Sequence, residues 1–295
     1  MTRTLLPALT LWQREIVRFL RQRSRVVGAL GQPVVFWLLL GGGLAASFRP
    51  PGAPEGTSYV EYFYPGIIAL IVLFTAIFAT ISVVEDRQAG FLQGVLVAPV
   101  ARWVVVLGQA LGATTLALLQ GALFLILAPF VGITLSVGTA TAAVGVMGLI
   151  AFALTCLGLL IAWRMDSTQG FHAIMNLILI PIWLLSGAFF PAQGAPSWMR
   201  WIMALDPLTY GVAALRRTLY LGDPAAVATL PPLAYSLGVT VAFGAAAFAA
   251  ATLAAEREPP PYCPPGNRRR PAEEATESPS ISASRGAARG RARPR

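Results

Sequence analysis

ATP binding is the first chemistry to look for in this sequence, and the residue that the commonest site requires is missing. A Walker A loop uses a lysine to reach the β- and γ-phosphates, whereas all 22 strongly basic residues here are arginines. The glycine run Gly41–Gly43 ends an apolar stretch and lacks the strand–loop–helix context of a dinucleotide site. We therefore expect no nucleotide site and no bound cofactor on this chain.

Residues for covalent or metal-assisted catalysis are equally sparse. His172 is the only histidine, and Ser186 lies 14 positions after it. On one helix these two residues would stand about 21 Å apart, too far for a catalytic dyad. Cys156 and Cys263 have no metal-site spacing, and no charged residue sits at the centre of a long apolar run to mark an ion path. The sequence thus predicts neither a catalytic residue nor a metal site, and we do not expect an enzyme.

One apolar run carries polar and aromatic side chains at helical spacing: His172, Asn176, Trp183 and Ser186. Such a face suits either hydrogen bonding between helices or the lining of a substrate path. The sequence leaves both interpretations open. If the stripe lines a path, then Asn176, Trp183 and Ser186 are the candidate residues.

Helices in a lipid bilayer are the elements that must position these residues. Hydrophobic residues make up 56% of the 295, and charged residues only 12%, against about a quarter in soluble domains. The shortest of the long charge-free intervals has 23 positions, about 35 Å of helix, while the hydrocarbon core is about 30 Å thick. We predict an all-α integral membrane protein with six transmembrane helices, near 28–48, 63–84, 103–130, 139–162, 172–191 and 229–254.

The distribution of arginine gives the orientation of these spans. Eighteen arginines lie before the first span, in the connections after spans two and four, or in the tail, and four lie in the other connections. Because positive charge is retained on the cytoplasmic side, we expect both termini in the cytoplasm. Residues 85–102 then face the cytoplasm as well.

Two segments flank the 28–255 transmembrane domain. Residues 1–27 combine apolar and arginine stripes at helical spacing, which predicts an amphipathic helix at the membrane interface; a plain cytoplasmic extension of the first span is the alternative. We expect membrane lipids as partners of this helix, because anionic headgroups would attract its arginine face. Residues 256–295 are rich in arginine and proline and poor in large apolar residues, which predicts a disordered cytoplasmic tail. We expect this tail to be solvated and not to bind nucleic acid.

The stretch 192–228 is too polar for a span and too apolar for an ordinary loop. We predict two short helices split at Pro207, forming a re-entrant outer hairpin before the last span that keeps its arginines, Arg216 and Arg217, in water. A surface loop is the alternative. Asp206 suits the N-cap of the second helix, with Pro207 at its first position.

The cytoplasmic sequence "EDRQAGFLQGVLVAPV" at 85–100 has the character of a docking element. We interpret Glu85 and Asp86 as the start of a helix, where carboxylates interact well with the helix dipole. The apolar stripe that follows, before Pro99 ends the helix, consists of Phe91, Leu92, Val95 and Leu96. An amphipathic helix of this kind can seat in a groove of a partner protein or lie on the inner leaflet, and periodicity does not separate the two.

Three motifs resemble the type-2 ABC exporter permease family: "VVEDRQAGFLQGVLVAPVARWVVVLGQALGATTLALLQG" at 83–121, "LLSGAFFP" at 184–191 and "DPLTYGVAALRR" at 206–217. The resemblance covers about residues 8–255. At the third motif the family usually has Asn-Pro-Leu-Thr-Tyr, so Asp206 is a departure that weakens any role tied to an amide there.

The resemblance implies a permease subunit of an exporter in the prokaryotic inner membrane, paired as a homodimer and driven by separate ATPase subunits that bind ATP and Mg²⁺. In that family the loop after span two contacts the ATPase, which assigns a coupling role to Glu85, Asp86, Arg87, Gly90, Phe91, Leu92, Val95, Leu96 and Pro99. The family's outer re-entrant segment corresponds to Asp206, Pro207, Leu208, Thr209 and Tyr210. Uncharged spans favour a hydrophobic or amphiphilic substrate; a nonenergised membrane scaffold that docks a cytoplasmic partner is the alternative function.

Overall fold

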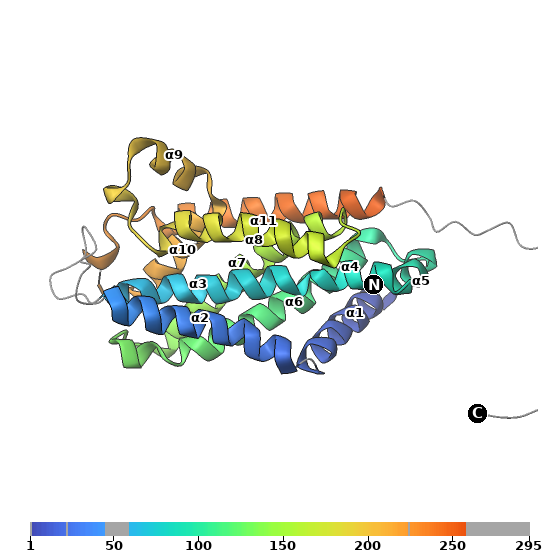
Figure 1. Ribbon diagram of the computed structural model, residues 1–295, viewed down its shortest axis with the longest axis horizontal. Helices are drawn as coiled ribbons and strands as arrows, with labels where there is room; N and C mark the ends of the chain where they lie inside the picture. The colour runs from blue at the N-terminus through green and yellow to red at the C-terminus, as the bar shows by residue number, and fades with distance from the viewer. Residues whose placement is uncertain (1, 22, 45–58, 224, 258–295) are drawn as a thin grey trace, which may run out of the picture. The chain divides into compact units, whose positions relative to one another are not determined.

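The computed structural model describes residues 2–21, 23–44, 59–223 and 225–257, and none of these residues forms a β-strand. Figure 1 shows the helices along the chain. Their bounds are α1 Thr2–Arg21, α2 Arg23–Leu44, α3 Tyr59–Ala79, α4 Ile81–Gln88, α5 Phe91–Val97, α6 Arg102–Leu125, α7 Val137–Ala162, α8 Thr168–Trp183, α9 Ser197–Leu205, α10 Pro207–Leu219 and α11 Leu233–Glu256.

Five helical segments are long and apolar enough to cross a membrane: Tyr59–Gln88, Arg102–Leu125, Val137–Ala162, Thr168–Ala188 and Leu233–Glu256. They correspond to predicted spans two to six, which confirms the all-helical membrane fold. The first predicted span falls on α2, whose apolar part, Pro33–Gly43, is shorter than a full crossing. The predicted tail begins at the last residue of α11, Glu256, and from residue 258 onward it lies outside the described residues.

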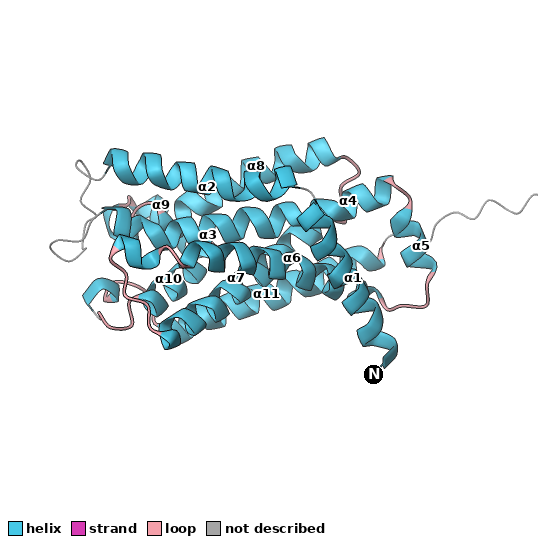
Figure 2. Cartoon of the chain, turned by 90° about the horizontal axis from the view of Figure 1, so that it is seen from below, coloured by secondary structure: helices cyan, strands magenta, loops and turns pink. Residues whose placement is uncertain are grey.

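The helix α3 is the centre of the bundle. It packs against α2, α6, α7 and α8, and Figures 1 and 2 show the long helices running side by side around it. Its residues from Phe63 to Leu73 are all buried, which explains why the sequence is apolar on every face. Its polar groups are paired inside the bundle: Thr75 donates a hydrogen bond to Gln120 of α6, and the Tyr64 hydroxyl donates to the Phe124 carbonyl at 2.6 Å.

Local sequence explains where the observed spans depart from the predicted bounds. The helix α6 ends at Leu125, before the predicted 130, because a 3-10 turn at Ala128–Val131 contains Pro129 and leads into Gly132 at φ 92°. Ser136 then caps α7 in a reciprocal capping box with Thr139. A turn therefore separates the third and fourth predicted spans.

The two ends of the bundle carry different elements. The helices α1, α4 and α5 gather at one end, called the α5 end here, and α9 and α10 lie at the other, called the α9 end (Figures 1 and 2). The helix α1 packs mainly on α6, with Ala8, Leu11 and Phe19 buried. The sequence placed one helix over 1–27, whereas α1 ends at Arg21 and α2 begins at Arg23.

Candidate functional site

The predicted coupling loop begins later than the sequence suggested. Glu85 and Asp86 do not start a helix; they lie in the second half of α4, which follows α3 directly at Thr80. The apolar run of α3 continues into α4, and the chain turns only at Gly90, whose φ of 74° is the left-handed conformation that favours glycine. The interpretation of the two carboxylates as an N-terminal dipole pair is therefore wrong.

Both carboxylates instead bind arginines of α1. The Arg14 guanidinium donates to the two oxygens of Asp86 at 2.6 and 2.7 Å, and Arg18 donates to Asp86 at 2.8 Å and to Glu85. Asp86 is buried, so these are charge-assisted bonds partly shielded from water. The four residues Arg14, Arg18, Glu85 and Asp86 form what we call the α1–α4 ion cluster.

Glu15 is buried beside this cluster. Loss of water around its carboxyl group raises its pKa, and a hydrogen bond from Ser82 opposes that rise. Nearby Asp86 raises the pKa of Glu15 further, because two close carboxylates resist ionising together. Arg14 lies 3.5 Å from the Glu15 carboxylate but 2.6 and 2.7 Å from the two oxygens of Asp86, so Asp86 is its closer acceptor.

Arg87 ties α4 to a third part of the bundle. Its guanidinium donates to the carbonyls of Trp163 and Met165, both at 2.7 Å, and to the Asp166 carboxylate at 3.2 Å. The Gln88 amide adds a bond of 2.8 Å to the Asp166 carbonyl. Side chains of α4 thus bind both α1 and the α7–α8 connection, directly before α5 begins.

The apolar stripe of α5 points partly inward. Leu92 is 3% exposed, and Val95 and Leu96 are half-buried against the same core. Phe91 is 42% exposed, with the Arg14 guanidinium 3.9 Å from its ring centre, and Val97 is 69% exposed. Of the predicted docking stripe, only Phe91 therefore faces outward to a large degree, and it is joined there by Val97 and the exposed Pro99.

At the α9 end, the predicted corner between two short helices is confirmed. Asp206 caps α10: its carboxylate accepts from the Leu208 N–H at 2.9 Å and from the Thr209 hydroxyl at 3.4 Å. Burial raises the pKa of Asp206 to about 7. Pro207 occupies the first turn of α10, and the Tyr210 hydroxyl closes the corner by donating to the Ala204 carbonyl at 2.8 Å.

The expectation that both arginines of α10 lie in water is wrong for one of them. Arg216 is 6% exposed; one of its nitrogens donates to the carbonyls of Tyr62 at 3.1 Å and Gly187 at 3.3 Å. The Gly187 carbonyl needs a donor outside its helix, because a φ of 77° at Gly187 breaks the regular pattern at the end of α8. Arg217 is half-buried and donates to the Pro231 carbonyl at 2.6 Å.

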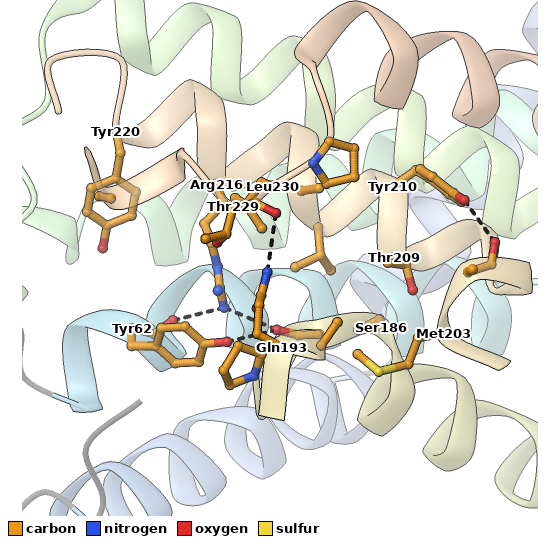
Figure 3. A pocket seen from close by; sticks show the side chains of 18 of the residues that line it. Tyr62, Ser186, Gln193, Met203, Thr209, Tyr210, Arg216, Tyr220, Thr229 and Leu230 are labelled. Atoms are coloured by element: carbon orange, nitrogen blue, oxygen red, sulfur yellow. Dashed lines mark hydrogen bonds between the residues drawn. The ribbon is translucent and has the colours of Figure 1, made fainter. Parts of the chain in front are cut away.

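A pocket of about 280 Å³ opens beside Arg216, between the end of α8, α9 and α10 (Figure 3). Ser186 is among its lining residues, so one member of the predicted path-lining stripe reaches a cavity. The other two do not line it: Asn176 is exposed on α8, and Trp183 is buried, with its indole donating to the Gly66 carbonyl at 2.9 Å. Among the residues that the structure describes, no group of His, Cys, Asp or Glu is arranged to hold a metal ion.

Sequence reasoning missed the partners of the acidic pair. The sequence assigned the arginine stripe of the first 25 residues to lipid headgroups. Two of these arginines, Arg14 and Arg18, instead form ion pairs with Asp86 and Glu85. The available signal was charge complementarity between the basic stripe and a neighbouring acidic pair in a chain with very few acidic residues.

Comparison with known protein families gives one model match. Residues 8–220 match the family model described as ABC-2 type transporter. The match begins inside α1 and ends just after α10, so it includes the α1–α4 ion cluster, α5 and the corner at Asp206.

Individual relatives are 26–29% identical to this chain. Nodulation protein J of Rhizobium leguminosarum bv. viciae is 29% identical over 223 residues, which cover 74% of this chain and 83% of the relative. Nodulation protein J of R. leguminosarum bv. trifolii is 27% identical over 221 residues, covering 73% and 82%. The Escherichia coli K12 protein named probable multidrug ABC transporter permease YbhR is 26% identical over 198 residues, covering 65% of this chain and 52% of the relative.

Proposed function

Because the chain belongs to the ABC-2 type transporter family, whose membrane permease domain has no nucleotide site and works with ATPase subunits, we propose that it forms the translocation path of an ATP-driven exporter. A separate chain binds ATP and Mg²⁺ and hydrolyses the nucleotide. This chain contributes the membrane path and the surface that receives the ATPase.

The proposed orientation puts the α5 end in the cytoplasm of a prokaryotic cell, with the chain in the plasma membrane and both termini inside. The excess of arginine in α1 and the first turn of α2, at Arg87, Arg102 and Arg164, and in the tail supports this orientation. The helix α2 completes six crossings in this arrangement, with α1 at the inner interface, and α9 and α10 form the outer re-entrant segment.

The proposed coupling surface is the exposed side of α5 and its flanking turns. The observation that supports it is that α4 binds two other parts of the bundle: α1 through Asp86, and the α7–α8 connection through Arg87. A displacement of α5 is therefore passed to α1 and to the α7–α8 connection together. Closure of an ATPase dimer beneath this end can then bias the bundle between two arrangements.

Val97→Asp tests this surface, because Val97 is 69% exposed and its loss should not disturb the core. With the cognate ATPase in proteoliposomes, we expect V97D to lose about tenfold in affinity for the ATPase, since a charge replaces an apolar contact. The matched control is Val137→Asp, which changes an 84% exposed valine at the first residue of α7. Wild-type ATPase stimulation by V97D would contradict the assignment, and an ATPase whose rate ignores the permease altogether would favour the nonenergised scaffold.

A second copy of this chain is the proposed partner within the membrane. The Asn176 amide lies exposed on α8 within a candidate span, where an unpaired amide facing lipid is costly. We propose that α8 meets its symmetry mate there. A cysteine at Asn176, in a chain without Cys156 and Cys263, should form a disulfide-linked dimer, whereas a cysteine at Val241, on the exposed face of α11, should not; equal cross-linking at both positions would contradict this interface.

The proposed substrate is a hydrophobic or amphiphilic molecule. The spans carry no carboxylate or cation at their centres that would handle a naked ion. The name of one relative specifies multidrug transport, which fits an apolar cargo class. The test is which compounds raise ATP hydrolysis by the reconstituted pair: stimulation by amphiphiles supports the class, and stimulation by small hydrophilic solutes alone contradicts it.

A further inference from the structure

The pocket at the α9 end contains a buried positive charge that the transport proposal does not use. Arg216 is 6% exposed, and it forms no ion pair with any carboxylate of the described residues. Its Nε is buried and has no hydrogen-bond partner among them. The guanidinium is offset only by two backbone carbonyls and by the face of the Tyr62 ring, 4.0 Å away.

Two carbonyl dipoles do not replace a counter-charge. A cation withdrawn from water is expensive unless an anion or a full set of acceptors surrounds it. The acidic residues of the pocket lining, Glu61 and Asp223, do not pair with Arg216 and have interactions of their own. An unpaired donor on a buried cation at the edge of a cavity is the arrangement that an anionic ligand completes.

The rest of the pocket suits the head of an amphiphile. Gln193, Thr209 and Tyr210 bring polar side chains to it, and Met203 and Val212 bring apolar ones. In Figure 3 the Arg216 side chain runs into the space between Tyr62 and Gln193. A cavity of about 280 Å³ has room for a phosphate with a small substituent but not for an acyl chain.

The faces of α9 place this cavity at headgroup depth. Arg200, Met203 and Ala204 line the pocket, while the other side of the helix exposes apolar and aromatic residues: Trp198, Trp201, Ile202 and Leu205. Tryptophan is enriched where membrane meets water. A helix with this composition rests in the interface, with its tryptophan-bearing side toward the acyl chains and the pocket on the opposite side.

We propose that this pocket binds a phosphate group, with the Arg216 guanidinium as its anchor. Lipid headgroups and free inorganic phosphate both offer this chemistry. The site is independent of whether the chain transports anything, since it depends on Arg216, the cavity and the position of α9.

The test is lipid binding by the purified full chain in neutral detergent, measured by native mass spectrometry. The probes are dioleoyl phosphatidic acid and dioleoylglycerol, which differ only by the phosphate. We expect the wild type to bind phosphatidic acid about tenfold more tightly. Arg216→Gln should bind the two lipids equally, whereas Arg164→Gln, which removes an exposed arginine at the α5 end, should behave as the wild type.

A second variant, Ala204→Trp, keeps the proposal testable if R216Q does not fold. Ala204 is exposed and lines the pocket, so the indole fills the cavity while Arg216 stays in place. We expect A204W to lose the preference for phosphatidic acid and to keep the wild-type melting temperature. Equal binding of the two lipids by the wild type, or an unchanged preference in folded R216Q or in A204W, would overturn the proposal.

Competition by inorganic phosphate then separates the two sources of the group. Displacement of phosphatidic acid at comparable concentrations assigns the site to the free anion. Failure to displace it, together with the dependence on Arg216, assigns the site to a lipid headgroup.

Discussion

Asp86 is the residue on which the α5 end depends most. It is 3% exposed and accepts three hydrogen bonds from two arginines. Asp86→Asn keeps the shape but removes the carboxylate that Arg14 and Arg18 share, while Arg18 keeps its bond to Glu85. We expect this change to lower the free energy of unfolding by about 2 kcal/mol, less than for a fully buried pair because the arginines are partly wet.

Asp166→Asn is the matched control for this prediction. The Asp166 side chain is 92% exposed and pairs with Arg87 at 3.2 Å, so solvent screens the interaction and stability should hardly change. Denaturant titration of both variants in detergent makes the comparison. Equal effects of the two substitutions would show that the α1–α4 ion cluster does not stabilise this end.

Asp206 gives stability a predictable pH dependence. Burial raises its pKa to about 7 in the folded chain, from 3.8 in the unfolded one. The folded state therefore holds the proton more tightly, and stability falls as pH rises from about 4 to about 7, then stays level. Asp206→Asn keeps an acceptor for the Leu208 N–H but carries no charge, so this contribution disappears.

The measurement is the melting temperature of wild type and D206N in parallel across that pH range. The difference, D206N minus wild type, should grow between pH 4 and 7 and then level off. A difference that is flat with pH would show that Asp206 ionises normally in the folded chain. The subtraction removes the contribution of every other titrating group.

At the residue scale, local sequence patterns predicted helix caps, but they did not predict which charged side chains are buried or which ones pair. The cap by Asp206 and the first-turn position of Pro207 follow from local rules and are confirmed. The pairing of Arg14 with Asp86 joins residues far apart along the chain, so no periodicity reports it. The burial of Arg216 was missed because rules for membrane flanks treat arginine as solvated.

At the element scale, the seat of α1 on α6 depends on two glycines one helical turn apart. A Cβ added at Gly108 would lie 2.9 Å from the Ala8 carbonyl oxygen, and one at Gly112 would lie 2.7 Å from the Glu15 Cβ. Small residues at this spacing allow two helices to approach closely. The backbone carbonyl cannot move aside as a side-chain end can, so α1 must shift if Gly108 is enlarged.

We expect Gly108→Ala to cost about 2 kcal/mol of stability through this overpacking, and to weaken stimulation of the ATPase, since α1 carries Arg14 and Arg18. The control is Gly145→Ala in α7, where nothing lies within 4 Å of the added Cβ and alanine favours the helix. Thermal denaturation in detergent compares the two variants. A G108A protein as stable as G145A would contradict the close packing.

Element positions were predictable to the extent that lipid dictates them. Charge-free intervals located spans two to six, because the bilayer core excludes charge from long helices. Helix ends were harder to predict. The sequence treated residues 85–100 as one element, whereas the chain divides there into the end of α4 and α5. The division at Gly90 depends on backbone conformation rather than on hydropathy. The inward turn of Leu92 also needed the tertiary structure, because an amphipathic stripe fits the chain's own core as well as a partner's groove.

At the scale of the whole molecule, the two ends of the bundle have different chemistry. At the α5 end, ion pairs and hydrogen bonds join α4 to α1 and to the α7–α8 connection; at the α9 end, α9 lies beside a pocket with a buried cation. This difference suits a transporter that is driven by an ATPase at one membrane face and binds an amphiphile at the other. The family match establishes a permease, while the direction of transport and the cargo are proposals.

The central claim is that a separate ATPase engages the α5 end from inside the cell. A photo-reactive amino acid at position 97, introduced in cells that also produce the cognate ATPase, tests this directly, with position 137 at the start of α7 as the control. We predict a light-dependent adduct between position 97 and a chain that contains a Walker A loop, and none from position 137. An ATPase adduct from position 137, or no ATPase adduct from position 97 in a correctly folded permease, would contradict this prediction.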